Sequence, residues 1–586
     1  NRLINFFFFF FEFNMFNEEK CYQDNCFQLP IEFLNDKQKL SKNLVNDLEL
    51  TETIHEDTKP VYNTLFNPTT EIGDKSIKSW SKYYTTNKNF LKESQKLYKN
   101  ANAIPFNKIQ IEKMIHSWKN IRNQNNFLEK YQYIDFEKLL FLNKSTIFLS
   151  ILSLYNISAP VVNLVAPIFV LIVPFAVLKV MNLPINWNSY YKILLENIKH
   201  HAIGKLLFSF NEVALGQKIY ILFLLGMYFY NIYQNIISCY RFYVNARYIA
   251  QEFETLNEYL DYTKNKIKLY LKMTENFKTY KPFNSKLKDY LDRIEKFHYE
   301  IKSIPTNQSP MQKIIFIGKS MKYFYILYDS YELENLMSFT FGFHGYIDTI
   351  LGINKQILSK KLNPISFTKS NKFKLKNMYY PNLKNPVKNN IDISKNHIIT
   401  GPNAAGKTTL IKASIINLLI SQQVGYGYFD NGKSGTFKHI HCYLNIPDSC
   451  SRDSLFQAEA RRCKNIIDQI KNYPNDRHFC IFDELYSGTN PYEAISSAYS
   501  YLTHISKNKN VKFLLTTHFI RLCNLLEKHK NIINKSMKTT VVNNDPNYSY
   551  KITNGISKIK GGVCVLKQLN YPEEIIDTTN KILEKL

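Results

Sequence analysis

The chain has 586 residues, 45% of them hydrophobic, which is enough for about two to four domains with buried cores. Its formal net charge of +26 suits contact with nucleic acid or with an anionic membrane surface, although its many Lys, Asn and Ile residues are also typical of an AT-rich genome. The 9 cysteines form no CxxC pair and no zinc-binding spacing, which excludes a disulfide framework of the small secreted kind and favours a reducing compartment.

The N-terminal residues show no strong hydrophobic period. They are polar with short apolar clusters, which predicts a loosely structured or helical region over 1–85, with translation beginning at Met15. The run from Phe6 to Phe11 imitates the apolar core of a signal peptide, but Glu12 follows it directly and no small-residue cleavage site is present. Longer helix-compatible segments then predict a helical region over 86–144.

An apolar region over 145–240 contains two runs without a charged residue, 145–178 and 219–240. Both exceed the roughly 20 residues that span a bilayer, so they predict two transmembrane segments. Proline residues in the first run would kink such a helix, which leaves a kinked span and a re-entrant hairpin open. The alternative is a pair of buried core helices in a large helical domain.

Residues 241–362 follow with a helical pattern. Ile249, Phe253, Leu256 and Leu260 recur at spacings of three and four, which predicts an apolar stripe on a lever-like helical arm. Asn363-Pro364 marks the boundary to a further domain, predicted over 363–554. Basic residues outnumber acidic ones there and beyond by about two to one, which fits either a solvated basic face or a contact with a polyanion.

A Gly-rich loop lies between an apolar strand, 397–400, and a helix-like stretch, 410–419. This strand, loop and helix context predicts a phosphate-binding P-loop in an α/β fold. The glycines turn backbone N–H groups inward, Lys407 supplies a charge for the β- and γ-phosphates, and the Thr408 hydroxyl is placed to ligate Mg²⁺. We therefore expect ATP and Mg²⁺ as cofactors, with ATP bound by Gly401, Pro402, Asn403, Ala404, Ala405, Gly406, Lys407, Thr408 and Thr409.

Two further strand ends carry polar residues. The apolar run 479–482 ends in Asp483 and Glu484, and such a strand would bring Asp483 to Mg²⁺ and Glu484 to the attacking water. His518 follows the strand 511–515, where it can hydrogen-bond the γ-phosphate. These positions predict Glu484, His518 and Lys407 as catalytic residues, with Thr408 and Asp483 as magnesium ligands. An exposed strand end with two acids is the alternative.

His439, His441 and Cys442 also invite a metal-site interpretation. Alternation of residues along one strand explains their spacing more simply than a metal site does.

Several motifs, in order, resemble the ATPase domain of the MutS DNA mismatch-repair proteins, which is an ABC-type P-loop ATPase. The loop of that family reads GPNMGGKST, and this chain has GPNAAGKTT. The family's DEIGRGTST is similar to the stretch from Asp483 to Asn490, and its STFMVEM to the stretch from Ser454 to Glu459, with Ser, Phe and Glu at the same spacing. The resemblance covers about 346–586.

The outer parts of that region also carry motifs of the family. Residues 380–383 and 389–391 resemble the family's HP and NDI motifs, with Tyr380 in place of His, and 555–586 looks like its C-terminal helix-turn-helix dimerisation element. The resemblance implies a homodimer with composite sites, in which Ser454 of one subunit contacts the γ-phosphate held by Lys407 of the other. Asn403 would help to organise that interface, and DNA is the implied partner.

The first half departs from the family, since the chain before Ser145 has no room for both a mismatch-reading and a connector domain. Phe10-Phe11-Glu12 and Phe127-Leu128-Glu129 match the family's Phe-x-Glu wedge, but a chain with 42 Phe produces such matches by chance. Mismatch recognition is therefore not expected from these residues.

We thus predict a homodimeric MutS-like ATPase in which hydrolysis drives a conformational clamp. The region 145–240 would tether it to membrane lipid, with the ATPase domain in the cytoplasm. If the apolar runs form a helical core, the protein is a soluble cytoplasmic DNA clamp instead. A membrane scaffold or remodelling switch that does not bind DNA is the other alternative. An ABC transporter half is disfavoured, because two spans are too few for a transport pathway and no LSGGQ-type signature is present.

Overall fold

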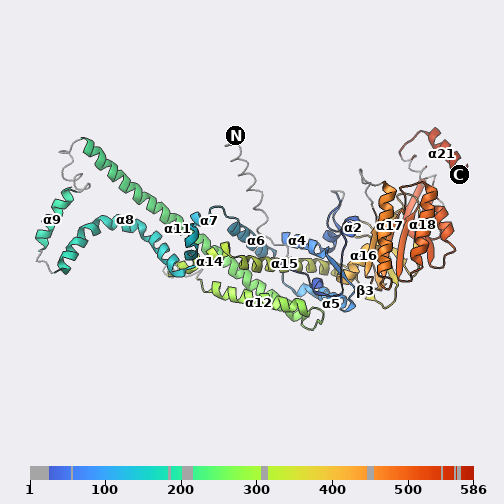
Figure 1. Cartoon of the computed structure of the whole chain (residues 1–586), viewed down its shortest axis with the longest axis horizontal. Coiled ribbons are helices and arrows are strands. Elements are labelled where there is room, and N and C mark those ends of the chain that lie inside the picture. Colours follow the sequence, from blue (N-terminus) through green and yellow to red (C-terminus); the bar gives the residue numbers. More distant parts are fainter. Residues whose placement is uncertain are drawn as a thin grey trace. The chain divides into compact units, whose positions relative to one another are not determined.

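A computed structural model describes residues 26–53, 57–181, 186–200, 215–304, 315–444, 454–542, 545–557, 559, 563, 566 and 569–585. Helices dominate as far as Leu358, and strands alternate with helices from Asn363 onward (Figure 1). This confirms the prediction of a mainly helical N-terminal half and an α/β C-terminal region. Met15 and the Phe10-Phe11-Glu12 match lie outside the described residues.

The chain divides into two compact units. One contains Ile109–Asn265 and Leu291–Ser338, and the other contains Asp24–Lys108, Lys266–Tyr290 and Phe339–Leu586. We call the first the helical unit and the second the α/β unit. Three helices, α11 (Leu215–Thr274), α12 (Lys281–Lys302) and α15 (Tyr331–Leu358), contribute residues to both.

The α/β unit is built around a six-stranded sheet with the order β13-β12-β6-β11-β10-β9. All its strands are parallel except β13, which pairs antiparallel with β12. The pairs Asp483↔Thr516 and Thr517↔Thr400 align the carboxyl ends of three neighbouring strands at one edge. The strands are β6 (Asn396–Thr400), β9 (His439–Tyr443), β10 (His478–Asp483), β11 (Val511–Thr517), β12 (Ile532–Val542) and β13 (Asp545–Asn554).

Helices cover this sheet because its strands are apolar on both faces. Apolar residues of α17 (Leu455–Asn472), α18 (Pro491–Ser506) and α19 (Ile520–Leu526) form one core cluster with Phe482 and Phe513 of the sheet. A second sheet of five strands has the order β5-β4-β8-β3-β7. It consists of β3 (Asn363–Phe367), β4 (Phe373–Met378), β5 (Asn389–Asp392), β7 (Tyr426–Gly427) and β8 (Asn431–Ser434).

The helix α16 (Lys407–Val424) is buried along nearly its whole length. It begins after Gly406 and ends at Gly425, whose φ angles of 87° and 78° are left-handed and favour glycine at both positions. Its buried polar side chains reach segments far away in the sequence. Gln422 Nε2 donates to the Phe437 carbonyl at 2.8 Å, and Gln423 Nε2 donates to the Trp80 carbonyl at 2.8 Å.

A segment that contacts α16 comes from the N-terminal residues, where the sequence predicts a loosely structured or helical region up to residue 85 and a helical region after it. Its described part carries short helices and two short strands, and β2 and α5 of this segment contact α16. Tyr62, for example, is fully buried and its hydroxyl donates to Gln423 Oε1 at 2.8 Å. The elements are η1 (Pro30–Phe33), β1 (Lys37–Lys39), α2 (Lys42–Asp47), α3 (Val61–Phe66), α4 (Glu71–Trp80), β2 (Tyr83–Thr85), α5 (Lys88–Lys99) and η2 (Ala101–Ala103).

The helical unit has an aromatic core. Phe127 is 1% exposed and stacks on Tyr328 with ring centroids 3.9 Å apart, so this Phe-x-Glu match is a packing residue. Arg122 pairs with Glu334 beside that core. The remaining elements of this unit are α6 (Lys108–Arg122), α7 (Phe127–Lys130), η3 (Glu137–Lys144), α8 (Thr146–Val180), α9 (Trp187–His200) and α14 (Ile317–Asp329).

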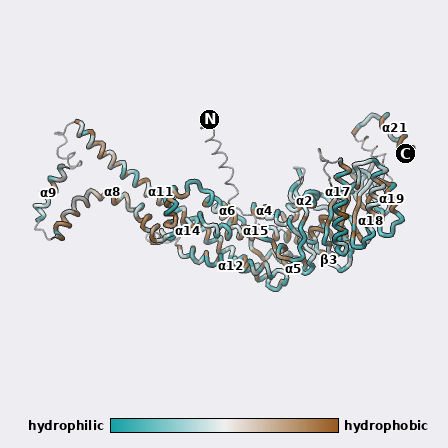
Figure 2. The backbone as a smooth tube through the Cα atoms, in the orientation of Figure 1, coloured by the Kyte–Doolittle hydropathy of each residue, from teal (hydrophilic) through white to brown (hydrophobic). Residues whose placement is uncertain are grey.

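The helix α8 is one continuous element that runs through Pro160, Pro167 and Pro174. Its first turns pack closely on α14. A Cβ atom added at Gly318 of α14 would lie only 2.5 Å from the Thr146 carbonyl oxygen. Beyond Ser153 most of its described side chains are exposed, including Leu154, Val162 and Leu164. Figure 2 colours the backbone of α8 by the hydropathy of its residues.

The prediction of two transmembrane segments is not supported. Among the described residues one segment, Thr146–Ala166, passes by length and composition as a membrane span, with a mean hydropathy of 1.6 and 17% of it buried. The core helix of a soluble protein would pass the same test. The second run, 219–240, belongs to the 60-residue helix α11. Its tyrosine, asparagine and glutamine residues lower the hydropathy below that of a span.

Candidate active site

The P-loop joins the end of β6 to the start of α16. All five residues of β6 are buried, which holds the start of the loop in the sheet. Gly406 and Ala404 have left-handed φ angles of 87° and 62°. Within the loop, Gly401, Pro402 and Ala405 are buried and Asn403 and Ala404 are exposed, and Thr409 is exposed in the first turn of α16.

Lys407 points back into this loop. Its Nζ donates to the carbonyl oxygens of Gly401 and Pro402 at 3.1 and 3.3 Å and lies 2.9 Å from His518 Nε2. The side chain is only 5% exposed, and burial lowers the pKa of the ammonium group, against the opposing charges of Glu484 and Asp483. The loop therefore holds Lys407 where a phosphate could replace these two carbonyls as its partner.

The two predicted magnesium ligands are hydrogen-bonded to each other. Thr408 Oγ1 donates to Asp483 Oδ2 at 2.8 Å, and the hydroxyl of Thr516 donates to the other carboxylate oxygen of Asp483. One carboxylate and one hydroxyl next to a phosphate site form the donor set that Mg²⁺ uses with nucleotides. These residues therefore fit the ion. Thr516 was not singled out in the sequence as a site residue, although it stands two positions before His518.

Glu484 and His518 form a hydrogen-bonded pair beside Lys407. His518 Nε2 lies 2.8 Å from Glu484 Oε1, and Lys407 Nζ lies 4.0 Å from the same oxygen. The hydrogen bond from His518 lowers the pKa of Glu484, with the charges of His518 and Lys407 adding to it and burial opposing it. A neutral ring whose Nε2 donates to Glu484 cannot accept from Lys407 at that nitrogen, so the two contacts compete.

The backbone of Glu484 is held in an uncommon conformation. Its φ angle is 52°, and its N–H donates to the Thr516 carbonyl at 3.0 Å. Residues with left-handed φ angles persist only where the surrounding structure holds them, and they are concentrated at functional sites. The structure thus brings Lys407, Thr408, Asp483, Glu484 and His518 together at the carboxyl ends of β6, β10 and β11.

Ser454 forms the N-cap of α17. Its hydroxyl accepts from the Gln457 N–H at 3.4 Å, and its own N–H donates to Gln457 Oε1 at 3.0 Å, which makes a capping box. Glu459 of the same helix is 2% exposed and accepts from the N–H groups of Ser487 and Gly488, both at 3.1 Å. The stretch 454–459 thus starts a helix that supports the loop after Asp483 and Glu484.

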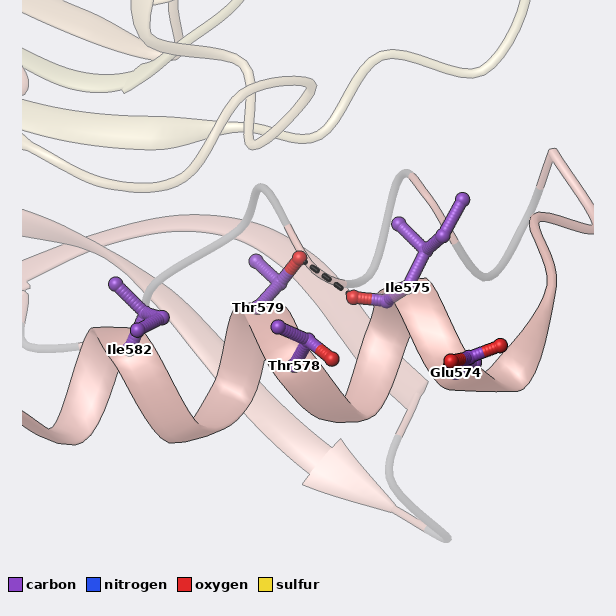
Figure 3. A pocket seen from close by; sticks show the side chains of 5 residues that line it. All are labelled: Glu574, Ile575, Thr578, Thr579 and Ile582. Atoms are coloured by element: carbon purple, nitrogen blue, oxygen red, sulfur yellow. Dashed lines mark hydrogen bonds between the residues drawn. The ribbon is translucent and has the colours of Figure 1, made fainter.

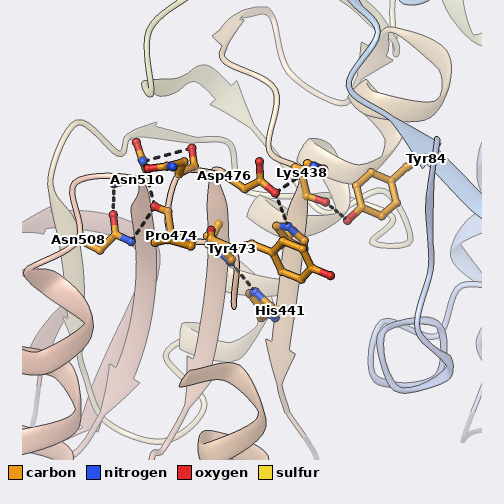
Figure 4. A network of polar contacts seen from close by, with 11 residues as sticks. Tyr84, Lys438, His441, Tyr473, Pro474, Asp476, Asn508 and Asn510 are labelled. Atoms are coloured by element: carbon orange, nitrogen blue, oxygen red, sulfur yellow. Dashed lines mark hydrogen bonds and ion pairs between the residues drawn. The ribbon is translucent and has the colours of Figure 1, made fainter. Parts of the chain in front are cut away.

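The histidines of β9 and β10 form a polar network with the loop before β10 (Figure 4). His439 Nε2 lies 3.0 Å from Asp476 Oδ2, His441 Nε2 lies 3.1 Å from His478 Nδ1, and His478 Nε2 donates to the Tyr473 carbonyl at 2.9 Å. Burial, followed by the charges of His478 and His439, lowers the pKa of His441 to about 3. Within the part of the chain that the structure describes, no group of three His, Cys, Asp or Glu residues could hold a metal ion.

The C-terminal helix α21 (Glu573–Lys585) presents apolar side chains to solvent. Ile575 and Ile582 are 45% and 50% exposed, and with three neighbouring residues they line a shallow pocket along the helix (Figure 3). Ile576, by contrast, is buried.

Comparison with known proteins identifies relatives of the α/β region. Residues 397–586 match the family model described as MutS domain V. The DNA mismatch repair protein MutS of Persephonella marina is 25% identical over 338 residues, which are 56% of this chain and 37% of that protein. The MutS protein of Phocaeicola vulgatus is 29% identical over 192 residues, 32% of this chain and 22% of that protein.

The MutS protein of Pseudothermotoga lettingae is 26% identical over 227 residues, 37% of this chain and 28% of that protein. The matched stretch thus spans well under half the length of each of these relatives. The region that matches the family model, 397–586, includes the P-loop, the β10 carboxylates and His518. These matches support a relationship between the C-terminal region of this chain and domain V of the MutS family.

Proposed function

We propose that this chain is a MutS-like ATPase that converts ATP and water to ADP and phosphate and uses the energy to change the conformation of a dimer. The observation that carries the proposal is the convergence of Lys407, Thr408, Asp483, Glu484 and His518 at one edge of a parallel sheet. That edge is where ligands bind in open α/β sheets.

Nucleotide binding begins at the P-loop. Its backbone N–H groups and the start of α16 receive the phosphates, and Lys407 exchanges the carbonyls of Gly401 and Pro402 for phosphate oxygens. Thr408 and Asp483 would hold Mg²⁺, which neutralises charge on the phosphate oxygens. In the hydrolysis step, Glu484 orients the water and takes its proton, and His518 contacts the γ-phosphate.

The proposed dimer uses two surfaces of the α/β unit. Exposed isoleucines on α21 suit a helix that packs against a second copy. The N-terminus of α17, with Ser454 and its polar hydroxyl, suits a contact with the γ-phosphate held by the partner subunit. Closure of two such sites on ATP would move the helices that continue into the helical unit.

DNA is the proposed partner of the dimer. Basic residues outnumber acidic ones by about two to one from residue 365 onward, which favours phosphate contacts. The MutS relatives carry the name of DNA mismatch repair proteins. Recognition of a mismatch is not part of the proposal, because Phe127 is buried in the aromatic core of the helical unit.

The assay for this function measures ATP hydrolysis by the purified full chain. Glu484→Gln removes the proposed base and should lower kcat by about 10²- to 10⁴-fold while ATP binding is retained and an ATP-bound dimer accumulates. Glu527→Gln, an exposed glutamate just after α19, is the matched control and should hydrolyse ATP normally. A Glu484→Gln variant with unchanged kcat would refute the role of Glu484.

A second candidate function is a membrane-bound ATPase switch that does not use DNA. The exposed apolar side chains of α8 favour it, since a helix that is apolar around its circumference requires either protein or lipid around it. Flotation of the protein with anionic vesicles, beside DNA binding at low salt, separates the candidates. Flotation without DNA binding would favour the membrane-bound switch, with its ATPase domain in the cytoplasm. DNA binding without flotation would favour a soluble clamp.

A further inference from the structure

A second pocket of the α/β unit is lined by strands of both sheets. Its walls come from β4 and β5 of the five-stranded sheet and from β6, β12 and β13 of the six-stranded sheet. Its volume is about 370 Å³, at the small end of the range for ligand pockets. His397 of β6 lines it four positions before Gly401, or about 13 Å along the strand. The pocket is therefore separate from the phosphate-binding loop.

His397 is the buried polar side chain among the residues that line this pocket. It is 3% exposed, and its Nδ1 has no hydrogen-bond partner among the described residues. The next residue, Ile398, joins the core cluster with α17, α18 and α19, so alternation along the strand places His397 on the opposite face of the sheet, at the pocket. Buried polar atoms rarely lack a partner, so this nitrogen points to a ligand.

Three lysines surround the same pocket. Lys535 of β12 lies on the same face of its sheet as His397, and Lys374 and Lys376 are exposed on one face of β4. Asp392 supplies the opposing charge among the lining residues. Its ion pair with Lys374, at 3.1 Å, is exposed to solvent and therefore weak. The lining thus carries an excess of positive charge that attracts an anion.

The protonation of His397 is sensitive to an anion beside it. Burial lowers the pKa of His397 to about 4, with the charges of Lys535 and Lys512 adding to this and the charge and backbone of Asp392 opposing it. The ring is therefore neutral at pH 7. An anion next to Nδ1 favours the charged ring, so the anion and the proton stabilise each other. Anion affinity should consequently rise as the pH falls below 6.5, the usual pKa of histidine.

We propose that this pocket binds the phosphate group of a small molecule, opposite the three lysines and His397. Lysine ammonium groups and an imidazolium are donors that form strong, charge-assisted hydrogen bonds to phosphate oxygens. The pocket also has an apolar part, which suits the carbon portion of a phosphate ester. Its apolar side chains are Leu375, Ile391 and Ile552. This site is distinct from the nucleotide site of the proposed function and does not depend on it.

The test is calorimetric binding of inorganic phosphate and of glycerol 3-phosphate to the full chain. A Lys407→Ala background removes the lysine of the P-loop, which would hold phosphate as well. In this background Lys535→Gln or Lys376→Gln should weaken both ligands by roughly ten-fold, because each removes one charged donor. Lys372→Gln, exposed just before β4 and outside the pocket lining, is the matched control. Tighter binding of the ester identifies an ester as the occupant, and equal or weaker binding identifies inorganic phosphate.

Sulfate supplies a second readout, because its charge does not change over the range in which His397 titrates. Its affinity should rise as the pH falls below 6.5, and His397→Gln should remove that rise. An equal rise in His397→Gln would refute the role of the histidine. The whole proposal is overturned if the Lys407→Ala chain binds neither phosphate ligand, or if it binds them and both lysine substitutions leave the affinity unchanged.

Discussion

The P-loop helix α16 and the distal part of α8 are both long helices without a clear polar face, yet their surroundings are opposite. Leu418 of α16 is fully buried, and Leu164 of α8 is 58% exposed. The first is enclosed by the sheet and by the short N-terminal helices, whereas the second extends beyond the part of α8 that packs on α14. A uniformly apolar helix therefore shows that some cover is required, but not whether protein or lipid supplies it.

The same contrast applies to polar residues. Gln422 and Gln423 of α16 are fully buried and find partners in carbonyls of Phe437 and Trp80. The side-chain amide of Asn156, in the first half of α8, donates to Gln132 Oε1 at 2.7 Å. Buried polar side chains thus tie α16 to its neighbours, whereas the apolar residues beyond the base of α8 need a different environment.

The largest expected difference comes from the same substitution in both helices. Leu418→Ala should lower the free energy of unfolding of the α/β unit by about 2–5 kcal/mol, because it leaves a cavity. Leu164→Ala should change it by less than about 0.5 kcal/mol in detergent-free buffer. Denaturant unfolding followed by circular dichroism checks both. Equal losses would show that the distal part of α8 is buried in solution.

A charge in α8 sharpens the comparison from the other side. If lipid covers this helix, Leu164→Lys should weaken vesicle binding by roughly a hundred-fold, since a lysine at the centre of an apolar helix costs about 2.5–3.5 kcal/mol there. Vesicle flotation measures the effect. Lys464→Ala, on the exposed face of α17, should float as the unaltered chain does. Normal flotation of Leu164→Lys would argue against a lipid contact at this site.

Removal of a buried amide tests the cover of α16 more gently. Gln423→Leu leaves the Trp80 and Tyr83 carbonyls and the Tyr62 hydroxyl without this partner, which should cost about 1–3 kcal/mol. Thermal unfolding of the full chain gives the value. Gln469→Leu, on the exposed side of α17, should be close to neutral. A neutral Gln423→Leu would mean that water replaces the amide.

The smallest expected effect is a shift in pH dependence. The hydrogen bond from His518 holds the pKa of Glu484 below its usual value. A lowered carboxyl pKa favours the native state above the pKa of the unfolded chain, and this contribution is lost as the pH falls through the native pKa. His518→Ala removes this hydrogen bond, so the pKa of Glu484 should rise and the base should become protonated at a higher pH. The acid limb of the kcat/KM profile should then move to higher pH. His504→Ala, at the end of α18, should leave the limb in place. An unmoved limb would show that Glu484 does not control it.

The active-site prediction from sequence was most informative where the chemistry is local. The P-loop motif places Lys407 and Thr408 by its own strand, loop and helix geometry, and the parallel pairing of β6, β11 and β10 then brings Asp483, Glu484 and His518 beside them. These residues stand at strand ends, so an apolar run followed by polar residues was a sufficient signal. Ser454 remains a prediction, because its proposed role needs a second subunit.

Other residues carried no such signal. Thr516 reaches Asp483 only because β10 and β11 are adjacent. Short-range geometry and apolar periodicity were thus sufficient to predict the α/β fold, the helical N-terminal half and the phosphate-binding loop from the sequence alone. The cover of α16 by the N-terminal segment, and the exposure of α8, depend on contacts between distant residues, and such contacts have no counterpart in local pattern.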